Sequence, residues 1–299
     1  MFKIPLIAFL LFYILSCTAQ DKPLVDLQKQ QWIHGSAECA TDTNVSIQVV
    51  QYNPSTWILR QNKCLNYEAP FLFLFLGEEK ALLMDTGATA DPFTFPLQKT
   101  VGRIIAQWET TLKKKTPLVV AHTHGHGDHH AADAQFKEVP NTTVVGLSAQ
   151  EVQQYFNIKN WPKEEVNINL GNRILDILPI PGHQSASIAV YDRDSQLLLT
   201  GDTFYPGRLY VEDWFAFKKS IKRLVDFSNT HKIHYILGNH IEMTRTLGKD
   251  YPIGTTYQPN EQPLPLFKED LYELHQALEH LGDVPTRKVH DKFIIYPTK

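Results

Sequence analysis

The sequence concentrates histidine in one short window. Of its 13 histidines, five lie in the stretch His-Thr-His-Gly-His-Gly-Asp-His-His at residues 122–130. Its ligand-type residues have the pattern His124-x-His126-x-Asp128-His129. Imidazole nitrogen and carboxylate oxygen are ligands that zinc and other borderline divalent metals accept. The pattern therefore predicts a metal site, in preference to a solvated loop that binds metal adventitiously.

Two glycines separate the ligand-type residues of this stretch. Gly125 and Gly127 have no Cβ, so we expect the backbone there to adopt unusual dihedral angles. His124 and His126 would then share one metal, and the two residues after Gly127 would turn toward a second.

The elements that must position these residues alternate between strands and helices. Their β-branched and aromatic content predicts strands at residues 45–52, 57–61, 71–76, 81–84, 144–145, 173–180, 187–191, 196–200 and 234–237. Apolar residues at helical spacing predict helices at residues 97–112, 149–156, 214–225 and 271–281. A short buried strand at 117–121 ends directly before the His-rich stretch. Interleaved strands and helices favour an α/β or α+β layered fold.

Length and composition favour one globular domain. The chain has 299 residues, 43% hydrophobic and 20% charged, and no Pro/Gly-rich linker divides its halves. We expect a polar N-terminal leader at residues 20–43 and one domain at 44–299. Lys+Arg is 29 against 32 Asp+Glu, a formal net charge of −3, which argues against a nucleic-acid partner. A small-molecule substrate is expected instead, and the oligomeric state is left open.

The N-terminus has the pattern of an export signal. Residues 1–19 hold one lysine, an apolar run of about a dozen residues, and then small and polar residues, too short a run to span a membrane. The Leu-Ser-Cys17 stretch resembles a lipobox, which would make Cys17 a lipid anchor and the one link to a membrane; ordinary cleavage after residue 19 is the alternative. Either predicts an exported protein, in the periplasm or at the outer membrane of a bacterium.

Cys39 and Cys64 are the two cysteines beyond this signal. Export to an oxidising compartment would permit a disulfide between them. Two buried free thiols are the alternative, and spacing does not decide between them.

The motifs as a set resemble those of the metallo-β-lactamase-fold hydrolase superfamily, whose signature is a Thr-His-x-His-x-Asp-His loop. Further family landmarks follow in order across residues 45–240: Asp85-Thr-Gly, Pro-Gly-His183, Gly-Asp202-Thr and Gly-Asn-His240. The resemblance implies a four-layer αββα sandwich of two mixed sheets flanked by helices, with a metal site at the sheet edge.

The resemblance also implies a ligand set for two divalent metals, zinc first, with iron or manganese as alternatives. It assigns His124, His126 and His183 to one metal. It assigns Asp128, His129 and His240 to a second metal, and Asp202 as the ligand that bridges both. Asp85 would lie behind the ligand loop and orient it by hydrogen bonds; a turn-initiating Asp is the alternative interpretation.

The implied chemistry is hydrolysis of an ester, thioester, lactone or amide. Two metals held close together can share a water and lower its pKa, so that a bridging hydroxide is available near neutral pH. Asp128 would orient this nucleophile and relay its proton. Because Asp202 is the bridging residue, the resemblance favours the glyoxalase-II-like and lactonase-like branch over true β-lactamases. Asp202-Thr-Phe-Tyr205 resembles the Asp-x-x-Tyr motif of quorum-signal lactonases, in which the phenol can donate a hydrogen bond to the developing oxyanion. The alternative is that Tyr205 is a half-buried aromatic residue without this role.

Other functions stay open on the same fold. They are a β-lactamase, a mono-iron persulfide dioxygenase-like oxidoreductase and a non-catalytic metal-binding protein. A nuclease is a further alternative, which the excess of acidic over basic residues disfavours. For the substrate pocket, the sequence indicates Trp214, Phe215 and Phe217 as wall candidates, with Trp214 and Phe217 at core spacing, and residues 248–265 as a rim loop.

Overall fold

The computed structural model describes residues 23–298. The predicted signal at residues 1–19 and the proposed anchor Cys17 lie outside the described residues. Within the described part of the chain, no helix combines the length and apolar character that a membrane span requires.

A six-stranded mixed sheet forms one half of the molecule, in the strand order β1-β2-β3-β4-β5-β6. Its strands are β1 (Ile47–Asn53), β2 (Thr56–Gln61), β3 (Phe71–Leu76), β4 (Ala81–Met84), β5 (Leu118–Ala121) and β6 (Thr142–Val144). The first four pair antiparallel, as the predicted meander requires, and β4, β5 and β6 are parallel.

A five-stranded mixed sheet forms the other half, in the order β12-β10-β9-β8-β7. Its strands are β7 (Val166–Asn169), β8 (Ile174–Pro179), β9 (Ile188–Asp192), β10 (Leu197–Gly201) and β12 (Tyr235–Gly238). A small third sheet joins β11 (Arg208–Val211), β14 (Ile294–Pro297) and β13 (Lys288–Val289).

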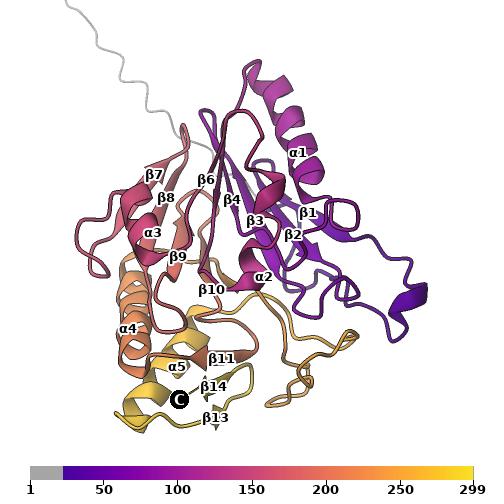
Figure 1. Ribbon diagram of the computed structural model, residues 1–299. Coiled ribbons are helices and arrows are strands. Elements are labelled where there is room, and N and C mark those ends of the chain that lie inside the picture. The colour runs from indigo at the N-terminus through magenta and orange to yellow at the C-terminus, as the bar shows by residue number, and fades with distance from the viewer. Residues whose placement is uncertain (1–22, 299) are drawn as a thin grey trace, which may run out of the picture.

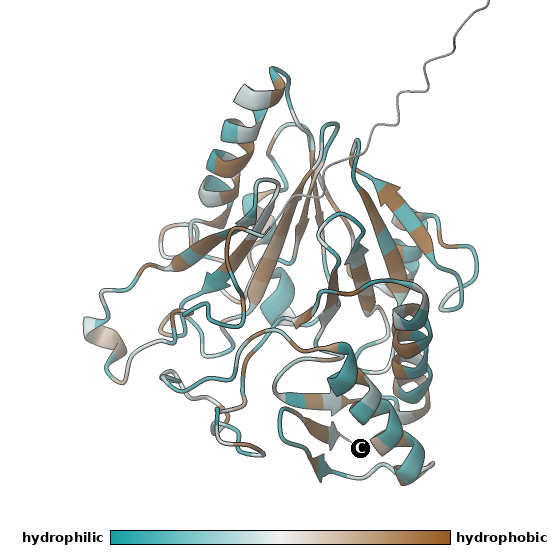
Figure 2. Ribbon diagram, turned by 180° about the vertical axis from the view of Figure 1, so that it is seen from behind, coloured by the Kyte–Doolittle hydropathy of each residue, from teal (hydrophilic) through white to brown (hydrophobic). Residues whose placement is uncertain are grey.

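Helices cover the outer faces of the two large sheets (Figure 1). They are α1 (Leu97–Leu112) on the first sheet, and α4 (Trp214–Thr230) and α5 (Lys268–Leu281) on the second. The short helix α2 (Gly127–His130) lies in the His-rich stretch, and α3 (Ala149–Phe156) packs into the core between the sheets. The 3-10 turns are η1 (Cys39–Thr41) and η2 (Asp133–Gln135). In Figure 1, α1 flanks one sheet and α4 the other, and Figure 2 shows largely brown strands between helices that are teal over much of their surface.

Strand β3 shows why the layers form. Its sequence Phe-Leu-Phe-Leu-Phe-Leu is wholly buried, and its side chains alternate between two cores. Phe71, Phe73 and Phe75 pack between the two sheets, whereas its leucines pack with Val101 and Ile105 of α1. On the other sheet, the residues of β10 alternate in the same way between this central core and the core under α4 and α5. The predicted αββα layering is confirmed.

The predicted elements match the observed ones within a few residues, with two kinds of exception. Helix α4 continues to Thr230, past the predicted end at 225, because Phe227 and Ser228 extend its buried face. The sequence does not predict strands β7, β11, β13 and β14, or the four-residue helix α2 within the His-rich stretch. β7 is a half-exposed edge strand and the others are two to four residues long, too short to show a periodic pattern.

A disulfide joins Cys39 to Cys64 and settles the alternative that the sequence left open. It ties the N-terminal segment at η1 to the loop between β2 and β3. Lys63, Tyr67 and Glu68 of this loop line one wall of a cavity.

Candidate metal centre

Three imidazoles from two loops converge on one point. His124 and His126 follow β5, and His183 lies in the loop between β8 and β9. His183 Nε2 is 3.1 Å from His124 Nε2 and 3.0 Å from His126 Nδ1, and these last two nitrogens are 3.1 Å apart. His124 and His183 are buried and His126 is partly exposed. The three nitrogens can each offer a lone pair to one cation.

A second group lies next to the first and contains Asp128, His129, Asp202 and His240, each with a ligand atom within 4.8 Å of the others. Asp128 Oδ2 is 3.3 Å from both His129 Nε2 and His240 Nε2. Asp202 comes from the end of β10 and His240 from the end of β12, so the parallel pairing of these strands places both at one sheet edge.

Asp202 lies between the two groups. Its Oδ2 is 3.5 Å from His129 Nε2 and 3.4 Å from His240 Nε2. The same oxygen is 3.9 Å from His124 Nε2 and 3.8 Å from His183 Nε2. Its Oδ1 is buried and has no hydrogen-bond partner among the described residues. A buried carboxylate oxygen without a donor fits a bridging position between two cations.

The outer nitrogens of two imidazoles are held by backbone carbonyls. His183 Nδ1 lies 2.8 Å from the carbonyl oxygen of Tyr210, and His240 Nδ1 lies 2.9 Å from that of Glu68. A carbonyl only accepts, so each Nδ1 carries the hydrogen and donates it. The inward Nε2 of each neutral ring is then the lone-pair nitrogen that a metal requires.

Asp85 lies behind the ligand loop, as the resemblance implies, and is fully buried. It accepts hydrogen bonds from Thr123 N at 2.8 Å, Thr123 Oγ1 at 3.0 Å and Asn239 Nδ2 at 2.6 Å. Thr123 precedes His124 and Asn239 precedes His240, so one carboxylate holds the segments that carry both ligand groups. The sequence did not predict the positioning roles of Thr123 and Asn239. Each directly precedes a ligand-type residue, and that adjacency could have indicated the role.

The expected glycine dihedrals are not found. Gly125 and Gly127 are absent from the residues with positive φ, so the loop does not use the left-handed region there. A Cβ on Gly125 would lie 3.1 Å from the carbonyl oxygen of Leu147, so close approach explains this glycine, whereas nothing lies within 4 Å of the corresponding point at Gly127. The prediction about their backbone was wrong.

The histidines of the first group are electrostatically suited to a cation. Burial lowers the pKa of His124 well below its usual value, and the charge of His129 adds to this effect. Burial likewise lowers the pKa of His183. Both rings are therefore neutral near pH 7 and keep their lone pairs.

The second group attracts positive charge. Burial alone would lower the pKa of His129 and of His240, but the carboxylates of Asp202 and Asp128 outweigh it and raise both well above the usual value. Burial would raise the pKa of Asp202, but the charges of His240 and His129 hold it well below its usual range. Two ionised carboxylates in a buried site need a cation, either protons on the imidazoles or a metal ion in their place.

The donor set and its dimensions fit divalent metals. Nitrogens about 2.0–2.1 Å from a tetrahedral zinc lie about 3.3–3.4 Å from one another. The observed separations of 3.0–3.1 Å in the first group are within a few tenths of an ångström of that value. The remaining two histidines of the His-rich stretch lie outside both groups, and His122 Nε2 is 2.9 Å from Asp133 Oδ1.

Tyr205 is fully buried, not half-buried. Its ring lies against that of His240, with centroids 5.7 Å apart. Its hydroxyl donates to the carbonyl of Arg208 at 2.5 Å and lies 3.1 Å from Glu242 Oε2. A phenol has one hydrogen, and here the carbonyl receives it. The structure does not bring a free phenol donor to the centre, and the oxyanion role stays a prediction.

The aromatic wall candidates separate as their spacing indicates. Trp214 and Phe217 pack in the core beneath α4, whereas Phe215 is 55% exposed. The predicted rim loop does border a cavity of about 200 Å³, through residues 252–255 and Gln258. Glu68 and Tyr210, whose carbonyls hold His240 and His183, also line it. This cavity therefore adjoins both ligand groups.

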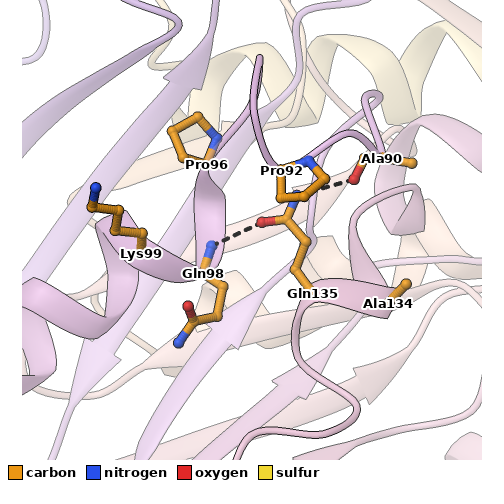
Figure 3. A pocket seen from close by; sticks show the side chains of 7 residues that line it. All are labelled: Ala90, Pro92, Pro96, Gln98, Lys99, Ala134 and Gln135. Atoms are coloured by element: carbon orange, nitrogen blue, oxygen red, sulfur yellow. Dashed lines mark hydrogen bonds between the residues drawn. The ribbon is translucent and has the colours of Figure 1, made fainter.

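A second hollow, of about 400 Å³, is lined by Ala90, Pro92, Pro96, Gln98, Lys99, Ala134 and Gln135 (Figure 3). Gln135 spans it, accepting from Gln98 N and donating to the carbonyl of Ala90. Its lining contains neither a ligand-type residue nor a residue whose carbonyl holds one, whereas Glu68 and Tyr210 line the cavity beside the centre.

Known proteins resemble this chain in sequence. It is 25% identical to the human acyl-coenzyme A thioesterase MBLAC2 over 203 residues, which are 56% of this chain and 72% of that protein. It is 32% identical to hydroxyacylglutathione hydrolase of Methylococcus capsulatus over 108 residues, 35% of this chain and 42% of that protein. The latter match thus spans less than half of the relative.

Solved structures and a family model agree on the fold. The structure of TMB-1 covers 80% of this chain and 100% of its own, with 12% identity and a TM-score of 0.50. The model of the metallo-beta-lactamase superfamily matches residues 69–287, a range that contains all seven ligand-type residues. The chain belongs to the metallo-beta-lactamase superfamily of hydrolases.

Proposed function

We propose that this protein is a binuclear metal-dependent hydrolase of the glyoxalase-II-like branch, and that it cleaves an ester, thioester, lactone or amide, with thioesters first. The observation that carries the proposal is the position of Asp202 Oδ2, within 3.9 Å of imidazole nitrogens from both ligand groups.

The proposed ligands follow the two groups. His124, His126 and His183 would hold one ion, and Asp128, His129 and His240 the other, with Asp202 between them. All are nitrogen or oxygen donors, which suits zinc. Bound divalent ions would supply Lewis acidity and a water nucleophile near neutral pH. The complete second group supports hydrolysis over the mono-iron alternative.

Asp128 is placed to handle a proton. Its side chain is 23% exposed, whereas those of Asp202 and His129 are 9% and 0% exposed. Burial would raise its pKa, but His129 and His240 lower it below the usual range, so the carboxylate is ionised and can accept a hydrogen bond from a reacting water. Asp202 is buried too deeply to play this part.

The names of two relatives support a thioester as the substrate. The named human relative is an acyl-coenzyme A thioesterase and the named bacterial relative hydrolyses hydroxyacylglutathione. Both names describe thioesters. Together with an Asp at position 202, they support thioester or ester hydrolysis over β-lactam hydrolysis in this chain.

We propose further that the protein is exported. The Cys39–Cys64 disulfide supports this, because such bonds persist in oxidising compartments. Attachment through Cys17 is part of the same proposal, and mass spectrometry of the N-terminus of the mature protein would test it.

Zinc-loaded protein should be assayed with thioesters, aryl esters, lactones and a cephalosporin, and with a His126→Ala/Asp128→Ala variant. We expect thioester or ester turnover that the double variant loses, together with about two metal ions per chain. His280→Ala, on the exposed surface of α5, is the matched control. Turnover of the cephalosporin alone, or one iron per chain with oxygen consumption, would overturn the proposal.

A further inference from the structure

The cavity beside the centre holds charged groups that the proposed hydrolysis does not use. It is lined by Lys63, Tyr67, Glu68, Arg208, Tyr210, Glu242, residues 252–255 and Gln258. Its volume of about 200 Å³ is below the ~300–1,000 Å³ of a site that encloses a whole drug-sized ligand. It therefore has room for one part of a substrate whose reacting bond lies at the metal centre.

Lys63 is the feature of this cavity that needs an explanation. The residue is only 3% exposed. Its Nζ donates to the carbonyl of Tyr67 at 3.0 Å, and this is its single hydrogen bond within residues 23–298. It forms no ion pair there, although an ammonium has three N–H donors. The carboxylates of Glu68, Glu242 and Glu261 act on this ammonium only from beyond ion-pair distance. A buried ammonium with no carboxylate in direct contact can still accept an anionic partner.

Gln258 is a second buried polar group in the same wall. It is 4% exposed, and its Oε1 has no hydrogen-bond partner among the described residues. The two ends of an amide are exchangeable by a flip of the side chain. Gln258 can therefore present either a donor or an acceptor to a polar ligand beside Lys63.

The other cation of the wall is already neutralised. Arg208 pairs with Glu242 at 2.8 Å and with Asp250 at 2.6 Å, and it also donates to the carbonyl of Tyr251. The carboxylates of Glu68 and Glu242 share the wall. Lys63 is the cation of this wall without a carboxylate in direct contact, and the two nearby carboxylates disfavour a second negative charge on a ligand. The cavity therefore suits a monoanion better than a phosphate dianion.

We propose that Lys63, assisted by Gln258, binds a carboxylate carried by the substrate, a short distance from the bond that is cleaved. This inference rests on the proposed function and narrows its substrate class to esters or thioesters with a free carboxylate. Lys63 is thus a specificity-determining residue. The carboxylate would lie close to the metal centre, because Glu68 and Tyr210 line the cavity and also hold His240 and His183 through their carbonyls.

The N-terminal segment fixes this lysine in place. Cys64, next to Lys63, is bonded to Cys39, and Gln258 N donates to the carbonyl of His34 at 2.8 Å. Gly35 has φ +78, and a Cβ there would lie 1.8 Å from the carbonyl oxygen of Thr256 and 2.8 Å from Lys63 Cβ. The segment is therefore wedged between the two walls of the cavity.

The charge state of Lys63 agrees with this role. Burial and the charge of Arg60 lower its pKa to about 8, while Glu261, Glu242 and Glu68 act in the opposite direction. The amine is thus mostly charged at pH 7 and loses its charge as the pH rises through about 8. Carboxylate binding should weaken over the same range.

The first test compares paired substrates. S-phenyl thioesters of dicarboxylic acids with two to four methylenes would be assayed beside counterparts whose free carboxylate is capped as a methylamide. Losing a charge-assisted hydrogen bond should raise KM for the free acids about 10- to 100-fold in Lys63→Met. KM for the capped substrates and both kcat values should stay within about twofold. Lys115→Met, at an exposed lysine beyond α1, is the control.

A binding titration separates this inference from the proposed function. N-methylglutaramate, a non-hydrolysable monoanion, would be titrated into the protein as purified, with neutral N,N′-dimethylglutaramide beside it. We expect wild type to bind N-methylglutaramate and not the neutral diamide. Gln258→Leu should bind the anion more weakly, and Lys63→Met should not bind it. Above pH 8 wild-type binding should fall. If wild type cleaves no thioester but shows this pattern, only the proposed function fails. Equal binding by wild type and Lys63→Met would overturn the inference.

Discussion

The metal centre and the Lys63 cavity lie side by side but are built differently. The centre is made from residues that follow β5, β8, β10 and β12, and Asp85 cross-links the loops after β5 and β12. The cavity has one wall on strand β11, through Arg208 and Tyr210, but its other walls are irregular segments: the loop after β2 and residues 252–258, held by a disulfide and an N-terminal segment. If both proposals hold, the rigid sheet edge carries the reaction and the attached segments select the substrate.

The two regions also differ in charge balance. In the candidate centre, two carboxylates in a buried site require added positive charge, which bound metal ions would supply. In the cavity, Arg208 is neutralised by Glu242 and Asp250, whereas Lys63 forms no ion pair among the described residues and feels Glu68, Glu242 and Glu261 only from a distance. Changes in the centre should therefore abolish activity for every substrate, and changes in the cavity should alter the choice between substrates.

Asp202→Ala should have the largest effect, because it removes the one carboxylate near both ligand groups. We expect kcat/KM to fall about a thousandfold or more for free-acid and capped thioesters alike, as several kcal/mol of lost electrostatic stabilisation implies. Elemental analysis should show fewer bound metal ions. A loss confined to free-acid substrates would mean that Asp202 belongs functionally to the cavity and would break the division between the regions.

Asp85→Ala should act next in size, through position alone. It leaves the buried donors of Thr123 and Asn239 without their acceptor, at about 1–3 kcal/mol each. Metal affinity should fall about 10- to 100-fold, measured by competition with a chelator. Asp85→Asn is the control, because Asn tolerates the left-handed backbone that φ +67 imposes and keeps one acceptor oxygen. Unchanged metal affinity in Asp85→Ala would contradict this role.

Replacing Cys39 and Cys64 by Ser should affect the cavity and spare the centre. The disulfide closes a loop with a sequence separation of 25, and its loss should lower the free energy of unfolding by about 3 kcal/mol. We expect the preference for free-acid over capped thioesters to drop several-fold, because Lys63 is no longer held against residues 252–258. Metal content should not change. Loss of metal in this variant would show that the two regions are coupled.

The centre could be predicted from sequence because its residues follow strands at short, typical spacings. The Phe-Leu alternation of β3 and the apolar stripe of α1 indicate which faces of these elements are buried, so the layered fold could also be predicted from sequence. Lys63 could not be found in this way. Its cavity partner Gln258 is far away in the chain, and neither residue lies in a periodic element, so only the folded structure brings them together.

Tyr205 is where the resemblance and the structure differ, and Tyr205→Phe should have the smallest effect on rate. The resemblance makes its phenol an oxyanion donor, and removing such a donor lowers kcat about 10²- to 10³-fold. In the structure the hydroxyl donates to the carbonyl of Arg208, between the centre and the cavity. We therefore expect less than about a threefold change in kcat.

The cost should appear in stability instead. The variant leaves the buried Arg208 carbonyl without this donor, so the free energy of unfolding should fall by about 1–2 kcal/mol, measured by urea denaturation. Tyr210→Phe is a matched control, because its hydroxyl also serves Arg208, accepting from Nε at 2.9 Å. A hundredfold fall in kcat for Tyr205→Phe alone, at unchanged stability, would return the phenol to the reaction. The hydroxyl would then have to leave the Arg208 carbonyl when substrate binds.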